Sequence, residues 1–186
     1  MKKLLGIIGI ILLFTSNVNA NERDNELNNL FTQLKNNDAS RAIKIENKIW
    51  KIWSTHPSND TQGSNLTKLL AKGSFLMSGK ELNKAYEIFS RIILVDPSWS
   101  EAWNKRATVL YLLGRYEQSQ KDIDEVLKLE QRHFGALSGQ GLVQIELKNY
   151  EKAINSYKKI QKIYPTMNAP KVMIPRLKQI IKDQSI

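Results

Sequence analysis

Apolar residues recur every three or four positions through most of the chain, which is the period of a helix with one buried face. Helical segments bounded by turn-forming residues follow one another in pairs, and Pro97 and Pro165 each follow the second helix of a pair. Proline fits there because it cannot continue the helical hydrogen-bond ladder. The pattern predicts an all-α fold with helices near 66–78, 82–94, 100–112, 116–129, 134–147 and 150–163.

The helical pairs repeat with a period of 34 residues. Leu82, Tyr116 and Tyr150 share one column of this repeat. Three further columns keep the same spacing, and they hold Ala85, Ser119 and Ala153, then Phe89, Ile123 and Tyr157, then Ile92, Val126 and Ile160. Chance rarely keeps four columns in register without a gap, so the chain contains three copies of one structural unit.

The period and the residues resemble the tetratricopeptide repeat, whose first helix carries Trp, Leu, Gly and Tyr and whose second carries Ala, Phe and Pro. The three units are 66–99, 100–133 and 134–167. Gln131 departs from the pattern at the usual proline, and Gln144 departs from it in a large-residue column. The resemblance implies an α-solenoid of three hairpins, with small residues such as Gly73 and Gly141 where paired helices meet closely. It does not specify a ligand.

A stack of hairpins leaves an apolar face at each end, so both ends need a cap. Residues 21–55 predict an N-terminal helical hairpin, either a degenerate repeat or a separate cap, followed by a linker at 56–65. Its inward residues are expected to be Leu27, Leu30, Phe31, Leu34, Ala42, Ile45, Ile49 and Trp53. Trp50 is expected to be partly buried, although Trp50 and Trp53 could instead form a partner-binding pair.

The C-terminal segment 168–186 predicts a capping helix over about 173–184, after an irregular start marked by Pro170 and Pro175. On one face of this helix the pattern places Met173, Leu177, Ile180 and Ile181.

Residues 1–20 have the pattern of a secretory signal peptide. Lys2 and Lys3 precede an apolar run at 4–14, and a Val-Asn-Ala site ends at Ala20. The run of eleven residues is too short to span about 30 Å of hydrocarbon. We therefore expect cleavage after Ala20 and a periplasmic or secreted protein of bacterial type.

The formal net charge of +10 is concentrated near the C-terminus. Residues 148–186 hold nine Lys or Arg against two acidic residues. Seven of these cations form a candidate surface for anionic lipid or cell-wall polymer, namely Lys158, Lys159, Lys162, Lys171, Arg176, Lys178 and Lys182. Nucleic acid would be another partner for a basic chain, but export argues against it.

No catalytic or metal-binding pattern is evident. Cysteine is absent, and His56 and His133 lack a second ligand at helical spacing, so each is expected to be a solvated turn histidine. Gly139 and Gly141 lie inside a repeat helix and do not form a phosphate-binding turn. The sequence therefore predicts no enzyme, no cofactor, no metal and no small-molecule substrate.

In this family the first helix of each repeat lines a concave groove. The register predicts a peptide-binding groove formed by Thr67, Leu70, Ser74, Met77, Asn104, Lys105, Thr108, Tyr111, Ser138 and Leu142. One subfamily grips a partner's terminal carboxylate with Lys, Asn and Arg, but Gly135 and Gly139 stand in two of those columns and Lys105 is the single cation. The clamp is therefore not expected.

The resemblance implies a scaffold that binds an extended or helical segment of another exported or envelope protein. Two alternatives remain open. The basic C-terminal end could dock on an anionic surface while the repeats are structural, or the protein could assist the maturation of another exported protein.

Overall fold

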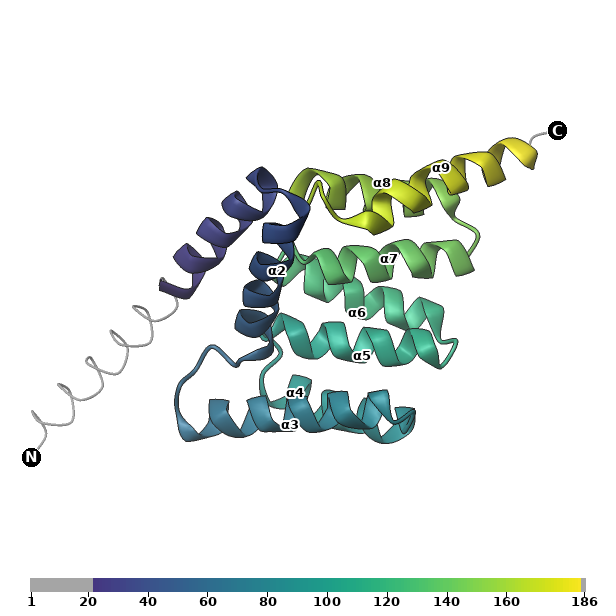
Figure 1. The fold of residues 1–186 in the computed structure, drawn as a ribbon. Coiled ribbons are helices and arrows are strands. Elements are labelled where there is room, and N and C mark those ends of the chain that lie inside the picture. The colour runs from purple at the N-terminus through teal and green to yellow at the C-terminus, as the bar shows by residue number, and fades with distance from the viewer. Residues whose placement is uncertain (1–21, 185–186) are drawn as a thin grey trace, which may run out of the picture.

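A computed structural model describes residues 22–184, and all regular secondary structure in this range is helical. Figure 1 shows three helical hairpins stacked in chain order, which confirms the predicted α-solenoid. The hairpins are α3 (Thr61–Ser78) with α4 (Leu82–Val95), α5 (Ser100–Leu112) with α6 (Tyr116–Leu129), and α7 (Phe134–Glu146) with α8 (Tyr150–Ile163). The expected signal peptide, 1–20, lies outside the described residues.

Small residues allow the helices of each hairpin to approach closely. A Cβ atom added to Gly73 would lie 2.6 Å from Cε1 of Phe89, and one added to Gly141 would lie 2.6 Å from Cζ of Tyr157. In the second hairpin the Ser119 hydroxyl donates to the Ala107 carbonyl at 2.8 Å. The predicted positions of these small residues are therefore confirmed.

The turn inside each hairpin has the same backbone conformation. Lys80, Gly114 and Lys148 follow one another at the repeat period, and all three have a positive φ, of 62°, 73° and 59°. Glycine adopts this left-handed conformation without steric cost, whereas lysine does so less readily. The tertiary fold therefore imposes the turn on all three repeats, whatever residue stands there.

Two predicted boundaries were wrong. Helix α3 begins at Thr61, where Asp60 accepts the N–H of Gly63 at 2.7 Å, so the second half of the predicted linker is helical. Helix α9 (Asn168–Asp183) starts ahead of Pro170 and contains Pro175 in its interior. Pro170 lies in the first turn, where the missing N–H costs nothing. Leu177 is buried, and Met173, Ile180 and Ile181 pack partly buried against the core.

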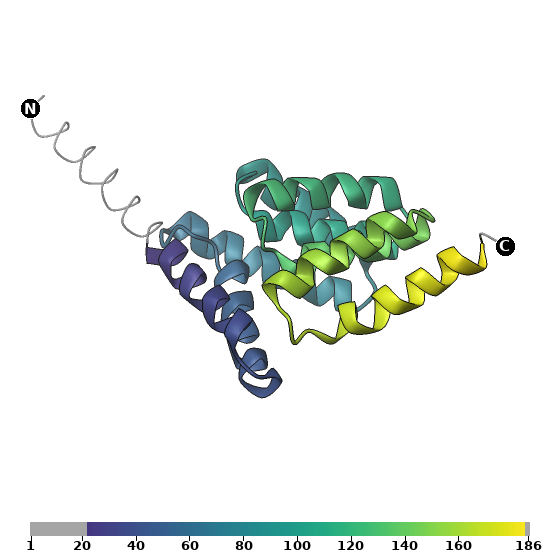
Figure 2. The same cartoon turned by 90° about the horizontal axis from the view of Figure 1, so that it is seen from above.

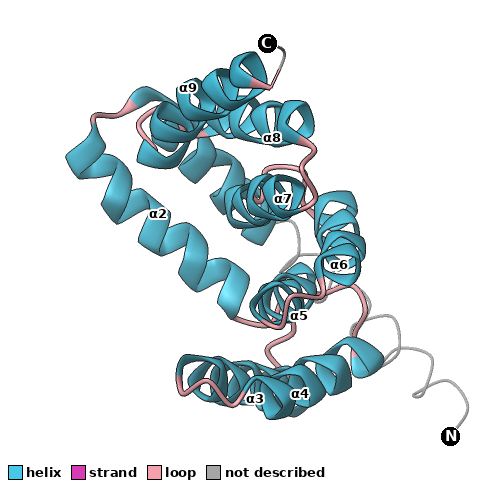
Figure 3. Ribbon diagram, turned by 90° about the vertical axis from the view of Figure 1, so that its right-hand side faces the viewer, coloured by secondary structure: helices cyan, strands magenta, loops and turns pink. Residues whose placement is uncertain are grey.

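The N-terminal hairpin lies across the stack and does not extend it. It consists of a helix at 22–36 and α2 (Ala39–Ser54), which Asp38 caps by accepting the N–H of Arg41 at 3.0 Å. Figures 1 and 3 show α2 crossing the ends of the repeat helices, and Figure 2 shows the hairpin beside the stack from above. All eight side chains that were predicted to point inward are buried.

The main core joins segments that are far apart in the chain. Leu34, Ile49 and Trp53 of the hairpin pack in one cluster with Phe134 and Tyr157 of the third repeat. A second cluster fills the first repeat and its contact with α5. Among residues 22–184, no helix combines the length and the apolar character that a bilayer crossing would need.

Candidate functional site

A cavity of about 190 Å³ lies where the first helices of the second and third repeats run side by side. The two helices bring together five of the ten predicted groove residues, which are Asn104, Thr108 and Tyr111 from α5 and Ser138 and Leu142 from α7. Ser119 and Ile123 of α6 and Gly135 and Gly139 of α7 complete much of the lining. We call this cavity the groove.

The groove contains both paired and unpaired polar groups. The Asn104 amide donates to Oε2 of Glu101 at 3.0 Å, and the Thr108 hydroxyl donates to the Asn104 carbonyl at 3.0 Å. In contrast, the buried Oγ of Ser138 has no hydrogen-bond partner among the described residues. Ser138 can therefore donate to, or accept from, a bound segment.

Tyr111 lies at one side of the groove. Its hydroxyl donates to Oε1 of Glu146 at 3.4 Å. Partial burial, together with the charge of Glu146, raises the pKa of the Tyr111 hydroxyl above its ordinary value. The hydroxyl therefore stays protonated at neutral pH and remains a donor.

The four predicted groove residues of the first repeat do not line this cavity. Leu70 is only 2% exposed and packs against Phe89 and Trp99, so its prediction as a ligand-facing residue was wrong. It lies in the buried cluster that the first hairpin forms with Trp99, Ala102 and Val109. The Thr67 hydroxyl donates to the Gly63 carbonyl, and the Ser74 hydroxyl donates to the Leu70 carbonyl. Met77 is half-buried beside the same cluster.

Lys105 lies outside the groove lining, and its charge is already compensated. Its Nζ lies 3.1 Å from Oε1 of Glu101 and 5.6 Å from the centroid of the Trp50 ring. Lys105, which was predicted to line the groove, therefore forms an ion pair inside the protein and does not face a ligand in the groove.

His133 is completely buried, so its prediction as a solvated turn histidine was wrong. Its Nε2 lies 3.0 Å from Oε2 of Glu101, and its Nδ1 accepts the N–H of Ala136 at 3.1 Å. A neutral imidazole with its proton on Nε2 makes both contacts at once. His133 thus caps α7 and also holds a buried carboxylate.

Glu101 is also fully buried, yet it favours the charged form. Burial alone would raise the pKa of this carboxyl group. The hydrogen bond from His133 and the ammonium group of Lys105 more than offset that effect and hold the pKa below its ordinary value. The charge is tolerated in the core because polar partners replace the lost water.

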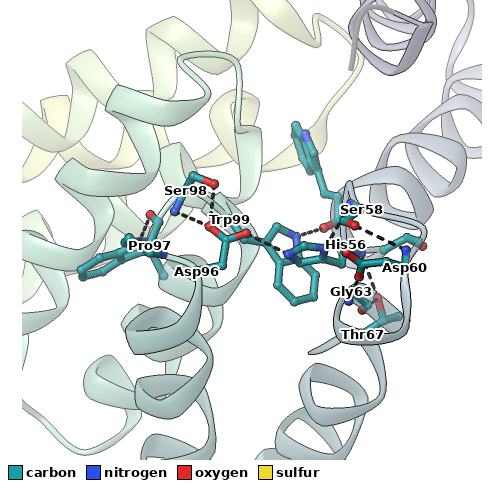
Figure 4. A network of polar contacts seen from close by, with 12 residues as sticks. His56, Ser58, Asp60, Gly63, Thr67, Asp96, Pro97, Ser98 and Trp99 are labelled. Atoms are coloured by element: carbon teal, nitrogen blue, oxygen red, sulfur yellow. Dashed lines mark hydrogen bonds and ion pairs between the residues drawn. The ribbon is translucent and has the colours of Figure 1, made fainter. Parts of the chain in front are cut away.

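His56, which lies ahead of the first repeat, also contacts a carboxylate with one ring nitrogen and a backbone N–H with the other (Figure 4). Its Nε2 lies 2.8 Å from Oδ2 of Asp96, and its Nδ1 accepts the N–H of Ser58 at 3.1 Å. Its side chain is 8% exposed, so it too was wrongly predicted to be solvated. The burial of Asp96 would raise the pKa of its carboxyl group, but hydrogen bonds from Ser98 and His56 lower that pKa below the ordinary value.

One sequence signal could have revealed the role of His133. It lies one repeat period after Trp99, and both residues immediately precede the first helix of a repeat. A side chain in that N-cap position commonly accepts a backbone N–H. For His56 no comparable signal exists, because it lies ahead of the repeats.

The N-terminal hairpin borders the groove at Gly135. A Cβ atom added to Gly135 would lie 2.5 Å from Cη2 of Trp50. Trp50 is half-buried and Trp53 is buried, which confirms their predicted placement. The indole N–H of Trp99 donates to the Trp53 carbonyl at 2.9 Å and fastens the end of α2 to the repeats.

All seven residues of the candidate basic surface are exposed on α8 and α9. Within the described part of the chain, none of them forms an ion pair. Their charges are therefore available to a partner.

Comparison with known folds supports the architecture. The Arabidopsis OM64 TPR domain superimposes with a TM-score of 0.60 at 21% identity, covering 62% of this chain and 96% of that one. The first TPR of Spaghetti (RPAP3) bound to the HSP90 peptide SRMEEVD gives 0.62 at 18% identity, with coverage of 66% and 96%. PcrH in complex with the chaperone binding region of PopD gives 0.55 at 14% identity, with coverage of 64% and 90%.

Sequence comparisons agree. Two family models described as tetratricopeptide repeat match residues 100–133 and 136–166. A TPR repeat-containing protein of Rhizobium etli is 32% identical over 140 residues, which cover 75% of this chain and 66% of the relative. This chain thus spans just under two thirds of that relative's length. Residues 100–133 and 136–166 are therefore tetratricopeptide repeats, and the helical hairpins of the chain are similar to that family.

Proposed function

We propose that this protein is a non-catalytic interaction module that binds a polypeptide segment in the groove between α5 and α7. The observation that carries this proposal is that five predicted groove residues from two repeats line one cavity, in which Ser138 offers an unpaired hydroxyl. Two proteins of similar fold are known with a segment of another protein bound, the HSP90 peptide SRMEEVD and a region of PopD. These complexes support a polypeptide as the ligand.

The charges around the groove indicate what kind of segment it binds. Lys105 is paired with Glu101, and Glu146 places a carboxylate beside Tyr111. An acidic tail such as SRMEEVD would therefore meet no free cation in the groove lining. We expect a neutral segment with small or apolar side chains, whose backbone groups bond to Ser138 and Asn104.

Substitution of the groove tests this proposal. Thr108→Trp should fill the cavity and reduce capture of the partner at least tenfold, because the bulky ring occupies the ligand's place. The matched control is Lys121→Trp, which adds the same ring at an exposed position of α6 outside the groove. Quantitative pulldown from envelope extracts measures both variants. A partner that binds both variants as well as the parent protein would exclude the groove as its site.

We further propose that the protein acts in the periplasm or outside the cell, where its partner is another exported or envelope protein. The basic, apolar and small-residue pattern of residues 1–20 supports this location. Mass spectrometry of the protein from its native host should find Asn21 as the first residue. An intact N-terminus beginning at Met1 would contradict export by cleavage.

A second candidate function is docking of the basic end on an anionic envelope surface. It is favoured by the seven exposed cations of α8 and α9 that lack ion pairs. Lysines near an anionic membrane contribute about 1 kcal/mol each, and salt screens that attraction over about 10 Å at 0.1 M. Sedimentation with anionic vesicles should therefore be strong at low salt and weak at high salt. Binding that does not depend on lipid charge would contradict this function.

A further inference from the structure

A second cavity, of about 210 Å³, lies between α7 and α8 and shares no lining residue with the groove. All the residues that line it are polar, and none carries a carboxylate. They are Gln140 and Gln144 of α7 and Lys152, Asn155, Ser156 and Lys159 of α8. We call it the α7–α8 pocket.

In the second repeat, charged side chains fill the position between α5 and α6 that corresponds to the α7–α8 pocket. There Arg106 and Asp122 form a bidentate ion pair, with both N–O distances at 2.7 Å. Their counterparts in the third repeat are Gln140 and Ser156, which are shorter and uncharged. The single proton of the Ser156 hydroxyl is shared between Oε1 of Gln140 at 2.8 Å and the Lys152 carbonyl at 3.0 Å, and the amide N–H groups of Gln140 remain donors. The third repeat thus keeps a hydrogen bond but loses the bulk of the arginine.

The charge at the α7–α8 pocket also differs from the charge at the corresponding position of the second repeat. Lys152 and Lys159 stand one period after Gln118 and Glu125. Both lysines are exposed, and neither forms an ion pair within residues 22–184. Two ammonium groups therefore border a pocket from which the carboxylates of the second repeat are missing. Such a pocket attracts an anion.

Gln144 adds a requirement for a hydrogen-bond donor. It stands one period after the buried Leu110, yet it is itself only 7% exposed. Its Nε2 donates to Oε1 of Gln120 at 2.7 Å. Because Nε2 of Gln120 donates in turn to Asp124 at 2.8 Å, the orientation of both amides is fixed. Oε1 of Gln144 is then a buried acceptor without a partner among the described residues.

We propose that the α7–α8 pocket binds a small hydroxylated anion of the kind that a glycerol phosphate group presents. The anionic oxygens face Lys152 and Lys159, and a hydroxyl group of the ligand donates to Gln144. The volume of about 210 Å³ suits such a group, since one water molecule takes up about 30 Å³ in the liquid. This ligand would supply both the charge and the donor that the pocket lacks.

The test is a titration of the purified protein at low salt, followed by NMR of the side-chain amide groups. Glycerol 3-phosphate should bind saturably and shift the amide signals of Gln140 and Gln144. Inorganic phosphate has the charge without the carbon-bound hydroxyls and should bind at least tenfold more weakly. Glycerol has the hydroxyls without the charge and should produce no saturable shift.

Three variants assign the binding to the pocket. Lys159→Gln and Gln144→Leu should each weaken glycerol 3-phosphate binding at least tenfold, whereas Lys162→Gln, on the same helix but outside the pocket, should leave it unchanged. Gln144→Leu should fold, because Leu110 fills the equivalent position of the second repeat. If that variant does not fold, the comparison of Lys159→Gln with Lys162→Gln decides whether the ligand binds in the pocket.

Several results would overturn the proposal. Equal weakening by Lys159→Gln and Lys162→Gln would mean diffuse attraction to a basic surface. If phosphate binds as tightly as glycerol 3-phosphate, the hydroxyl groups of the ligand do not contribute to binding. A titration that does not saturate would show that the pocket is not a specific binding site.

Discussion

The imidazole ring of His133 lies flat on the indole ring of Trp53, with the ring centroids 3.9 Å apart and the ring planes 8° from parallel. Trp53 belongs to α2, and His133 is the N-cap of α7. The same imidazole bonds to Glu101 at the start of α5. One stacked pair therefore connects the N-terminal hairpin with the second and third repeats.

Replacing His133 by alanine should lower the free energy of unfolding by about 3–5 kcal/mol. The change removes one of the donors to the buried Glu101, removes the acceptor for the N–H of Ala136 and takes the stacking surface from Trp53. Urea unfolding followed by circular dichroism measures the loss. In the double variant His133→Ala/Glu101→Gln no buried charge remains, so its loss should be smaller than the sum of the two single losses. Additive losses would contradict a direct coupling between the two side chains.

The stability of the protein should depend on pH through Glu101. Its pKa in the folded state lies below the ordinary value of 4.5, so the folded protein binds this proton less readily than the unfolded chain. The resulting stabilisation is complete above that ordinary value and is lost as the pH falls through the lower folded value. Between about pH 5 and about pH 3, Glu101→Gln should lose less unfolding free energy than the parent protein. Equal losses in the two proteins would contradict this contribution.

Two glycines of α7 should respond in opposite ways to the same substitution. Gly141→Ala places a Cβ atom 2.6 Å from the buried ring of Tyr157 and should cost about 1–3 kcal/mol. In Gly139→Ala the nearest atom, Cδ1 of Ile123, lies at an ordinary 3.6 Å. That variant should gain up to about 1 kcal/mol from helix propensity. Thermal unfolding compares them, and equal shifts in Tm would mean that the helices of this hairpin are not in close contact at Gly141.

The hairpins of the repeats could be predicted from the sequence because their contacts are local. Gly73 meets Phe89, and Gly141 meets Tyr157, at the same separation within each 34-residue unit. A small residue in one column and a large one in the next therefore specify the packing of a hairpin. The same reasoning placed Asn104 beside Ser138 and Thr108 beside Leu142, because the two residues of each pair are one period apart on adjacent helices. Chain order and periodicity were sufficient for this part.

The tertiary structure alone decided where the N-terminal hairpin lies and what it covers. Trp53 and His133 are far apart in the chain and belong to no common period, so their stacking depends on the shape of the assembled repeats. Tertiary contacts also bury both histidines, which the sequence predicts to be solvated: His133 packs on Trp53, and His56 packs on Trp99. Leu70 is buried in a different cluster, formed by the first repeat and α5, because burial depends on which helix packs against a residue as well as on its own helical face. Non-local packing of this kind leaves no periodic signal in a single sequence.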